Sequence, residues 1–397
     1  MDVIHQSEEK SESVTLNIPE EIIHYDILTR VPVKSLLRFK SVCKYWYTLI
    51  NSSTFINIHQ KYCVESRSQD YSSEFFIVSN EYGSNTCELT YIDAHNFTSV
   101  RNFKIEDANN RNYFNIVGSC NGFICLKLTN YYSGFKLCNP LTKEFRNIID
   151  HPRYNNGTRL KDTDYLQRYG FGYDFVRRDY KIVVVTCYRK YSYSPLFGRG
   201  VVQVYSTRTN SWKKTDEFSP NLFLMGNGLA INNMLHWNVV LGEKDDSNKH
   251  DILTFDLHTE KLGRISYSIK LKNELALGLM VGLMVSNGRL CTITKHLTKD
   301  GRIGFWTMNK YGVSESWMKL YEFEGGEVCC FDLVNVIYGS RMNFEEVLVT
   351  KHVKVDELVW YNLKDKSIRR LGIRRSRTYY ADEWACIGSL APLPSNC

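Results

Sequence analysis

The chain has 397 residues, of which 43% are hydrophobic, 23% charged and 13% aromatic. This apolar fraction can build a sizeable core and excludes global disorder, and 24 glycines with 8 prolines exclude a collagen-like chain. The formal net charge of +7 is mild for this length, whereas a nucleic-acid-binding protein normally carries a denser basic stripe. The charge therefore favours an acidic protein surface as partner over nucleic acid.

The start of the chain, Met1–Lys10, is polar and lacks the apolar core of a secretory signal. The longest apolar run, Leu275–Val285, is about half of the ~20 residues that a membrane helix needs. The 12 cysteines form no CxxC pair. We therefore expect a soluble protein of the cytoplasm, with the nucleus as a second compartment, no membrane contact and reduced, mostly buried thiols.

Residues 1–15 are polar and are predicted to be flexible, and residues 16–62 are predicted to form a small helical module. Its first helix follows Pro19 and ends near Val31, because a residue before proline resists the α conformation. A second helix begins at Pro32, a third follows an N-cap at Ser41, and a fourth covers residues 54–62. The polar residues 63–73 are predicted to be a linker.

Residues 74–397 consist of short β-branched and aromatic runs separated by Asn, Gly, Asp and Ser turns, which predicts an all-β domain. One unit recurs: apolar residues lead into a polar turn, and a bulky residue stands six positions after an anchor in four clear copies and further along in two weaker ones, which begin at Asp93 and Met308. The anchors are Asp93, Asn139, Ser206, Asp256, Met308 and Asn362, with separations of 46, 67, 50, 52 and 54 residues.

A period near 50 residues is typical of a four-stranded propeller blade, and each copy is then an outer hairpin. The long separation contains the polar stretch 151–167, which is interpreted as a loop insertion. We predict a kelch-like propeller of about six blades, or five with an irregular end. A β-sandwich with repeated hairpins is the alternative.

The helical module is rich in apolar side chains for its size, and a unit this small buries only part of its surface when it folds alone. Exposed apolar patches usually mark an interface. The alternative is that the helices only cap the edge of the propeller.

The segments Ile18–Ile23, Ile27–Trp46 and Leu49–Ile50 closely resemble the F-box motif, with Ile18 where that family usually has leucine. The resemblance implies docking on a Skp adaptor and, through it, on the cullin of an SCF ubiquitin ligase. Trp46 is the strongest single anchor on this interpretation. The positions that match docking or core residues of the family are Pro19, Ile22, Ile23, Ile27, Leu28, Pro32, Leu36, Leu37, Val42, Cys43, Trp46, Leu49 and Ile50.

The second part resembles the F-box-associated, kelch-like domain of plant F-box proteins. The signatures are Ser119–Cys125, Asn139–Thr142, Gly170–Asp174, Leu235–Trp237 and Tyr311–Trp317. The size and domain order also resemble S-locus F-box proteins, whose pollen-expressed members recognise S-ribonucleases in self-incompatibility. Relatives that act in defence or signalling share the same signatures, so an unrelated target of that kind is the alternative.

No catalytic, metal or cofactor site is predicted, since the chain has no GxSxG, HExxH or P-loop pattern. The pairs Gly170/Gly172 and Gly226/Gly228 are interpreted as tight β-turns. Structural roles are expected for the histidines at 236, 258, 296 and 352, and Cys329–Cys330 is interpreted as a pair of inert thiols.

The one dense basic run is Arg369–Arg377. A solvated connection between strands is the simple interpretation, and a contact with an acidic patch of a target is the functional one, with RNA phosphates less favoured. The candidate substrate-binding residues are Arg369, Arg370, Arg374, Arg375 and Arg377. The long connections 151–167, 188–200 and 242–250 are expected to discriminate between targets.

The sequence therefore predicts a non-catalytic substrate-recognition subunit of an SCF ligase: residues 16–62 bind the adaptor and the propeller binds a protein that is ubiquitinated and degraded. A lectin-like propeller and an RNA-binding propeller are the alternatives of another class. RNA binding would weaken steeply with salt, whereas apolar adaptor docking would not.

Overall fold

A computed structural model gives the structure of the chain. It describes residues 19–31, 33–65, 74–81, 86–93, 98–106, 112–130, 133–152, 165–189, 197–218, 222–241, 249–268, 270–271, 273, 278–286, 288–296, 302–323, 331–333, 346–351, 356–362, 364–375, 381–387 and 393. The predicted flexible start (1–15), most of the linker, Pro32, Cys329–Cys330 and Arg377 lie outside these residues.

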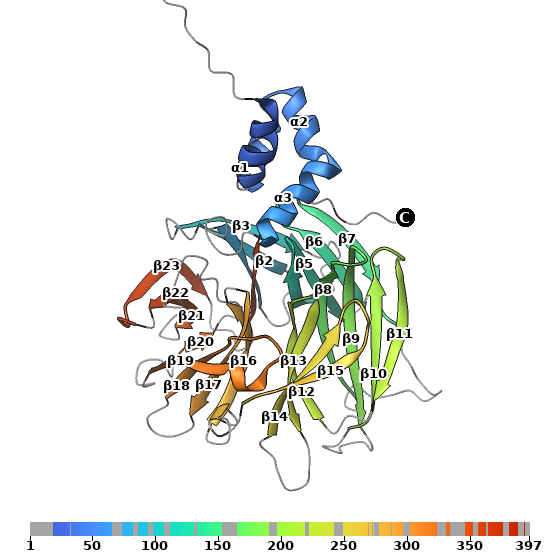
Figure 1. Ribbon diagram of the computed structural model, residues 1–397, viewed down its shortest axis with the longest axis vertical. Helices are drawn as coiled ribbons and strands as arrows, with labels where there is room; N and C mark the ends of the chain where they lie inside the picture. The colour runs from blue at the N-terminus through green and yellow to red at the C-terminus, as the bar shows by residue number, and fades with distance from the viewer. Residues whose placement is uncertain are drawn as a thin grey trace, which may run out of the picture.

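The helical module begins the described chain and lies at one end of the strands, in blue at the top of Figure 1. Its elements are the π-helix η1 (Ile22–Ile27), the 3-10 helix η2 (Leu28–Arg30), α1 (Val33–Phe39), α2 (Lys44–Asn51) and α3 (Ser53–Glu65). The prediction of an N-cap at Ser41 is wrong. Cys43 holds that position, with extended backbone and its Sγ accepting the Trp46 N–H at 3.4 Å.

The predicted boundary at residue 62 is also three residues too early, because α3 continues to Glu65. Neither glycine nor proline stands between Tyr62 and Glu65, so nothing in this segment stops the helix.

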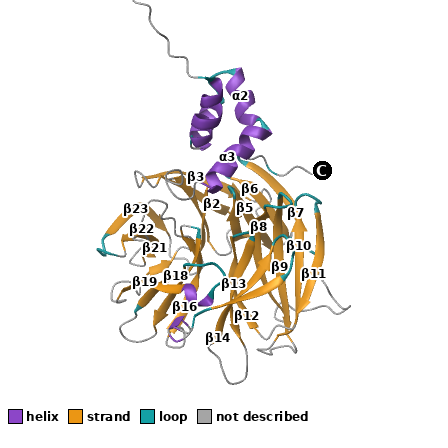
Figure 2. Cartoon of the chain, in the orientation of Figure 1, coloured by secondary structure: helices purple, strands orange, loops and turns teal. Residues whose placement is uncertain are grey.

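After the module the described chain is almost entirely strand (Figure 2). Six four-stranded antiparallel units follow one another among the described residues, two of them joined into one eight-stranded sheet. The strands of the first three units are β24 (Ala381–Ile387), β1 (Glu74–Glu81), β2 (Thr86–Asp93) and β3 (Thr98–Glu106); β4 (Asn112–Cys120), β5 (Phe123–Asn130), β6 (Gly134–Asn139) and β7 (Glu144–Ile149); β8 (Tyr165–Asp174), β9 (Asp179–Arg189), β10 (Phe197–Ser206) and β11 (Ser211–Phe218).

The strands of the other three units are β12 (Leu222–Ile231), β13 (Met234–Leu241), β14 (Lys249–Asp256) and β15 (Leu262–Ser266); β16 (Gly278–Ser286), β17 (Arg289–His296), β18 (Ile303–Met308) and β19 (Trp317–Phe323); β20 (Phe331–Leu333), β21 (Glu346–Lys351), β22 (Asp356–Asn362) and β23 (Ile368–Arg375). A short 3-10 helix, η4 (Ser314–Ser316), precedes β19.

The ring is closed by pairing the last strand, β24, with the first, β1, so the two ends of the domain share one sheet. This arrangement confirms the predicted propeller of about six blades and excludes the sandwich. A closed ring leaves only short outer edges for pairing with other chains.

The recurring anchors stand where predicted, at the end of the third strand of each unit, and the fourth strand follows as an outer hairpin. In three units the anchor side chain accepts backbone N–H groups two and three positions ahead: Asn139, Asp256 and Asn362. The residue four positions after each of these anchors has positive φ: Lys143 (60°), Glu260 (60°) and Lys366 (61°). Polar Asn and Asp anchors therefore form the turns by local hydrogen bonding.

The glycine pairs are not tight turns, and that prediction is wrong. Gly170 and Gly172 lie within β8, and Gly228 lies within β12 opposite Gly170, in the single parallel pairing between the third and fourth units. A Cβ on Gly228 would stand 2.5 Å from the Trp237 ring. Glycine is needed there because the ring of a buried tryptophan packs directly on the backbone.

In the second, third and fourth units, the turns after the first and third strands lie at the same end of the antiparallel sheet, here called the turn end. In the fourth unit they touch, since the Leu257 N–H donates to the Asn233 carbonyl at 3.0 Å. The helical module sits on the turn end of the second unit. One apolar cluster contains Leu28, Leu36 and Ile50 of the module together with Phe123 and Leu137 of the propeller.

Candidate docking surface

The helical module divides the predicted docking positions by exposure. Leu28, Leu36 and Ile50 are almost fully buried and form its core. Ile23, Leu37, Trp46 and Leu49 are half-buried against the same cluster. Pro19, Ile22, Ile27, Val42 and Cys43 are exposed. The last set is the most accessible to a partner, and sequence alone could not separate it from the core.

Six large apolar side chains of the module face solvent, with 43% to 63% of their surface exposed. We call them the docking face; they are Ile22, Tyr25, Ile27, Val42, Tyr45 and Tyr47. The three tyrosines were not among the predicted docking residues. They lie on the same helices as those residues, and this position could have indicated them. Apolar side chains that stay exposed beside a formed core indicate an interface with another protein.

The two elements that carry the docking face are held side by side by a polar contact. The Tyr45 hydroxyl of α2 lies 3.0 Å from Nε2 of His24, which is buried in η1. The same hydroxyl donates to Glu20 at 3.4 Å, and the Tyr45 and His24 rings are 5.3 Å apart. This contact therefore places Tyr45 of α2 beside η1, the element that carries Ile22, Tyr25 and Ile27.

Glu144, at the start of β7, lies near both the C-terminal segment of the chain and the helical module. The C-terminal Leu393 donates its N–H to Glu144 at 3.3 Å, at the turn end of the second unit. Lys40 lies near the same carboxylate: burial lowers the pKa of Lys40, and the charge of Glu144 opposes that change. The module thus both caps the propeller, as the alternative interpretation held, and keeps a free docking face.

The predicted basic run forms the outer strand β23 of the sixth unit and is not a loop. Arg369 and Arg370 are exposed on it. In the register, Arg374 stands opposite Glu357 and Arg375 opposite Asp356 of β22. The run therefore belongs to a paired strand as far as Arg375, and Arg377 lies outside the described residues.

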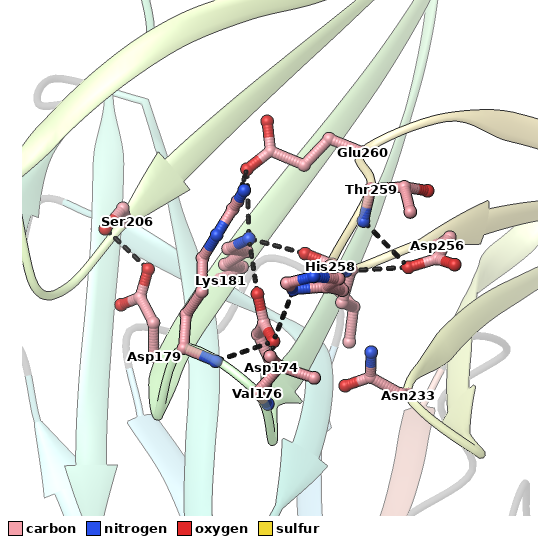
Figure 3. Close-up of polar contacts among 12 residues, drawn as sticks. Asp174, Val176, Asp179, Lys181, Ser206, Asn233, Asp256, His258, Thr259 and Glu260 are labelled. Atoms are coloured by element: carbon pink, nitrogen blue, oxygen red, sulfur yellow. Dashed lines mark hydrogen bonds and ion pairs between the residues drawn. The ribbon is translucent and has the colours of Figure 1, made fainter.

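A buried ion cluster, which sequence reasoning missed, joins the third and fourth units at the turn end (Figure 3). The Lys181 ammonium lies 3.0 Å from Asp174 and 2.9 Å from Glu260, and it also donates to the Leu257 carbonyl. Lys213 reaches the second oxygen of Glu260 at 2.7 Å. Lys181 is only 1% exposed.

Both carboxylates of this cluster are kept ionised. Burial acts to raise the pKa of Asp174 and of Glu260, yet hydrogen bonds and the Lys181 charge outweigh it and lower both values. For Asp174 the largest opposing contribution is the Arg177 backbone N–H, and for Glu260 it is the Lys213 side chain. The cluster is made of residues that are far apart in the sequence, so no local sequence pattern predicts it.

Of the histidines for which structural roles were expected, His236 fills such a role. His236 is fully buried, with Nδ1 at 3.1 Å from the Leu229 carbonyl and Nε2 at 2.7 Å from the Tyr311 hydroxyl. Burial lowers the pKa of His236 to about 4, so the ring is neutral at pH 7. The contact links the fourth unit to the turn of the fifth. His258 lies 3.6 Å from Asp174, at the ion cluster.

Within the described parts of the chain, no group of three or more His, Cys, Asp or Glu side chains is arranged to hold a metal ion. No described helix is long and apolar enough to span a membrane. Cys43, Cys125, Cys138 and Cys187 are free thiols; burial raises the pKa of Cys138 and of Cys187 to about 12, so those two thiols are unreactive.

Comparison with known proteins agrees with this architecture. Residues 16–57 match the F-box domain family, and residues 80–386 match the F-box associated beta propeller domain family. In Arabidopsis thaliana, F-box/kelch-repeat protein At3g23880 is 24% identical over 319 residues (78% of this chain, 80% of that protein). F-box protein CPR1 is 25% identical over 387 residues (92% and 87%).

Among solved structures, an acylaminoacyl peptidase of Pyrococcus horikoshii aligns with a TM-score of 0.38 at 10% identity, covering 77% of this chain and 44% of that one. A likeness this weak supports no conclusion about activity. The family match covers most of the chain, and the structure shows both parts that it requires. The chain belongs to the F-box proteins that carry an F-box-associated β-propeller domain.

Proposed function

We propose that the chain is the substrate-recognition subunit of an SCF ubiquitin ligase, with a Skp-type adaptor bound to the docking face and a target protein bound to the propeller. The observation that carries the proposal is the docking face. Six large apolar side chains remain exposed on a module whose core is complete and whose other side is already seated on the propeller. An exposed apolar surface of this kind usually binds another protein.

The chain itself needs no catalytic group in this role. It raises the effective concentration of the target's lysines near the ubiquitin-loaded enzyme, so transfer is accelerated by proximity. The cytoplasm and the nucleus are the proposed compartments.

The test is affinity capture from plant cell extract with the full chain and two variants. Ile27→Glu places a charge on the docking face, and Ile149→Glu is the matched control, since Ile149 is 87% exposed on β7 of the propeller. A central interface residue is worth about 2 kcal/mol or more, or roughly 30-fold in affinity. We expect Ile27→Glu to lose the Skp adaptor and cullin while Ile149→Glu keeps both.

Equal recovery of the adaptor by the two variants would contradict the proposal. Deleting residues 1–62 is a poorer test, because the module and the propeller share one apolar cluster and the deletion would expose its propeller half.

The identity of the target is a separate question. An S-ribonuclease stays a prediction from domain size and order, and a defence or signalling protein is the alternative. Capture of pistil proteins with the full chain distinguishes them: specific recovery of an S-ribonuclease supports the first, and its absence from the captured proteins opposes it.

A further inference from the structure

A second exposed surface lies at the turn end of the third unit, at the tip of the β8–β9 hairpin. Phe175 is 48% exposed and Val176 is 68% exposed, in adjacent positions. Arg177 and Arg178 follow directly and are also exposed. We call residues 175–178 the hairpin tip. Two large apolar side chains beside two arginines, all turned to solvent, form a combination that is enriched at protein interfaces.

The backbone of the hairpin tip is held from three directions. Asp174 accepts the Val176 and Arg177 N–H groups at 3.0 and 3.1 Å, and Asn233 of the next unit accepts the Phe175 N–H at 3.0 Å. Arg178 has φ of 52°, a conformation that non-glycine residues rarely adopt. The Tyr173 ring packs edge-on against Phe175 at 5.2 Å. The tip is therefore rigid before any partner binds.

The buried ion cluster adjoins this tip through Asp174, and Figure 3 shows Asp174, Lys181 and Glu260 together. Buried ion pairs contribute little net stability, because desolvation of the charges offsets their attraction. Their better-attested effect is to fix one geometry. Here the fixed residue is Asp174, whose other oxygen caps the tip. Rigidity of a binding surface raises affinity because less freedom is lost on binding.

The surroundings of the hairpin tip carry an excess of positive charge. The carboxylates are already engaged: Glu260 with Lys181, Arg177 and Lys213, and Asp179 with Ser206, Thr207 and the Arg208 N–H. The exposed cations at or next to the tip are Arg177, Arg178 and Arg208, whose backbone N–H donates to Asp179 at 2.9 Å. Arg177 and Lys213 already pair with Glu260, so Arg178 and Arg208 are the exposed cations that can meet negative charge from outside.

We infer that the hairpin tip is a second docking surface of this protein, which binds an acidic segment of a protein other than the adaptor. An apolar side chain of that segment contacts Phe175 and Val176, and its carboxylates meet Arg178 and the neighbouring cations. The positive surroundings select an acidic sequence, and the two apolar side chains select a peptide over a simple polyanion. This surface does not depend on the docking face for its binding.

The test measures fluorescence anisotropy of a labelled peptide in which glutamates flank a Leu-Phe pair, titrated with the full chain. The variants are Phe175→Ser with Val176→Ser, and Arg178→Glu. The matched control is Lys366→Glu, which makes the same charge change at an exposed turn residue of the sixth unit with φ of 61°. We expect the wild type to bind, each tip variant to bind at least tenfold more weakly, and the control to bind like the wild type.

Four results would overturn the inference: no binding of the peptide by the wild type, tip variants that bind normally, equal weakening by Lys366→Glu, or tighter binding of single-stranded RNA than of the peptide. Adaptor capture by the tip variants is measured in parallel and is expected to be unchanged. A loss of the adaptor in these variants would refute a separate partner. Because the titration contains no adaptor, a failure of the proposed ligase role would not alter its outcome.

Discussion

Lys181→Met tests the buried ion cluster most sharply. The substitution keeps the length of the side chain but removes the ammonium that lies 2.9 to 3.0 Å from Glu260 and Asp174. The two buried carboxylates then lose a positive charge that balances their negative charge. Breaking a buried pair in this way costs about 3–5 kcal/mol in the free energy of unfolding. Lys213→Met is the control: its ammonium also contacts Glu260, but its side chain is 56% exposed, so the cost should stay below about 1 kcal/mol.

The assay is urea unfolding of both variants and the wild type, followed by tryptophan fluorescence at pH 7 and pH 5. Without Lys181, burial is less opposed and the pKa values of Asp174 and Glu260 rise, so the carboxylates take up protons sooner as the pH falls. The destabilisation should therefore be smaller at pH 5 than at pH 7. A loss below 1 kcal/mol at pH 7, or one that does not change with pH, would refute the role of Lys181.

Further predictions concern the ring, the glycine contacts and the module. The pKa of His236 falls from 6.5 to about 4 on folding, so only the unfolded chain takes up this proton between those values. The free energy of unfolding should fall by roughly 3 kcal/mol as the pH drops from 6.5 to 4. The variant His236→Gln should lack this fall. Equal slopes of the free energy of unfolding against pH in the wild type and the variant would contradict the prediction. Gly228→Ala should lower the free energy of unfolding by about 1–3 kcal/mol, because the added Cβ clashes with Trp237. Gly226→Ala is the control: its Cβ would meet no atom within 4 Å, so it should cost no more than the ~1 kcal/mol of its positive φ. Equal shifts of the thermal midpoint in the two variants would count against the packing argument. Trp46→Ala should destabilise the module, because it removes the packing of Trp46 on the Phe39 ring, 5.3 Å away. Weaker binding of the adaptor should then be accompanied by faster proteolysis of the module. Normal resistance to protease would show that Trp46 acts at the interface alone.

The propeller was predictable because its signal is local. Asn139, Asp256 and Asn362 form their turns through hydrogen bonds to residues two and three positions away, and that chemistry repeats with the blade period. The glycine pairs were misinterpreted for the opposite reason. Gly170 and Gly228 are required by a contact with Trp237, which a linear pattern does not reveal.

The helices of the module were predictable from apolar spacing, but the spacing does not say which apolar face is covered. Ile27 and Leu28 are neighbours in the chain, yet one is 43% exposed and the other 1%. The ion cluster depends on Asp174, Lys181 and Glu260, which come from two units and meet only when the ring assembles.

The central claim is that another protein covers the docking face. Hydroxyl-radical labelling of the purified full chain, with and without a purified Skp adaptor, measures this cover residue by residue. Labelling of Tyr25 and Tyr47, which are 51% and 57% exposed, should fall several-fold with the adaptor, while labelling of Phe223, 43% exposed on β12, should stay constant. Unchanged labelling of both tyrosines at saturating adaptor would contradict the account.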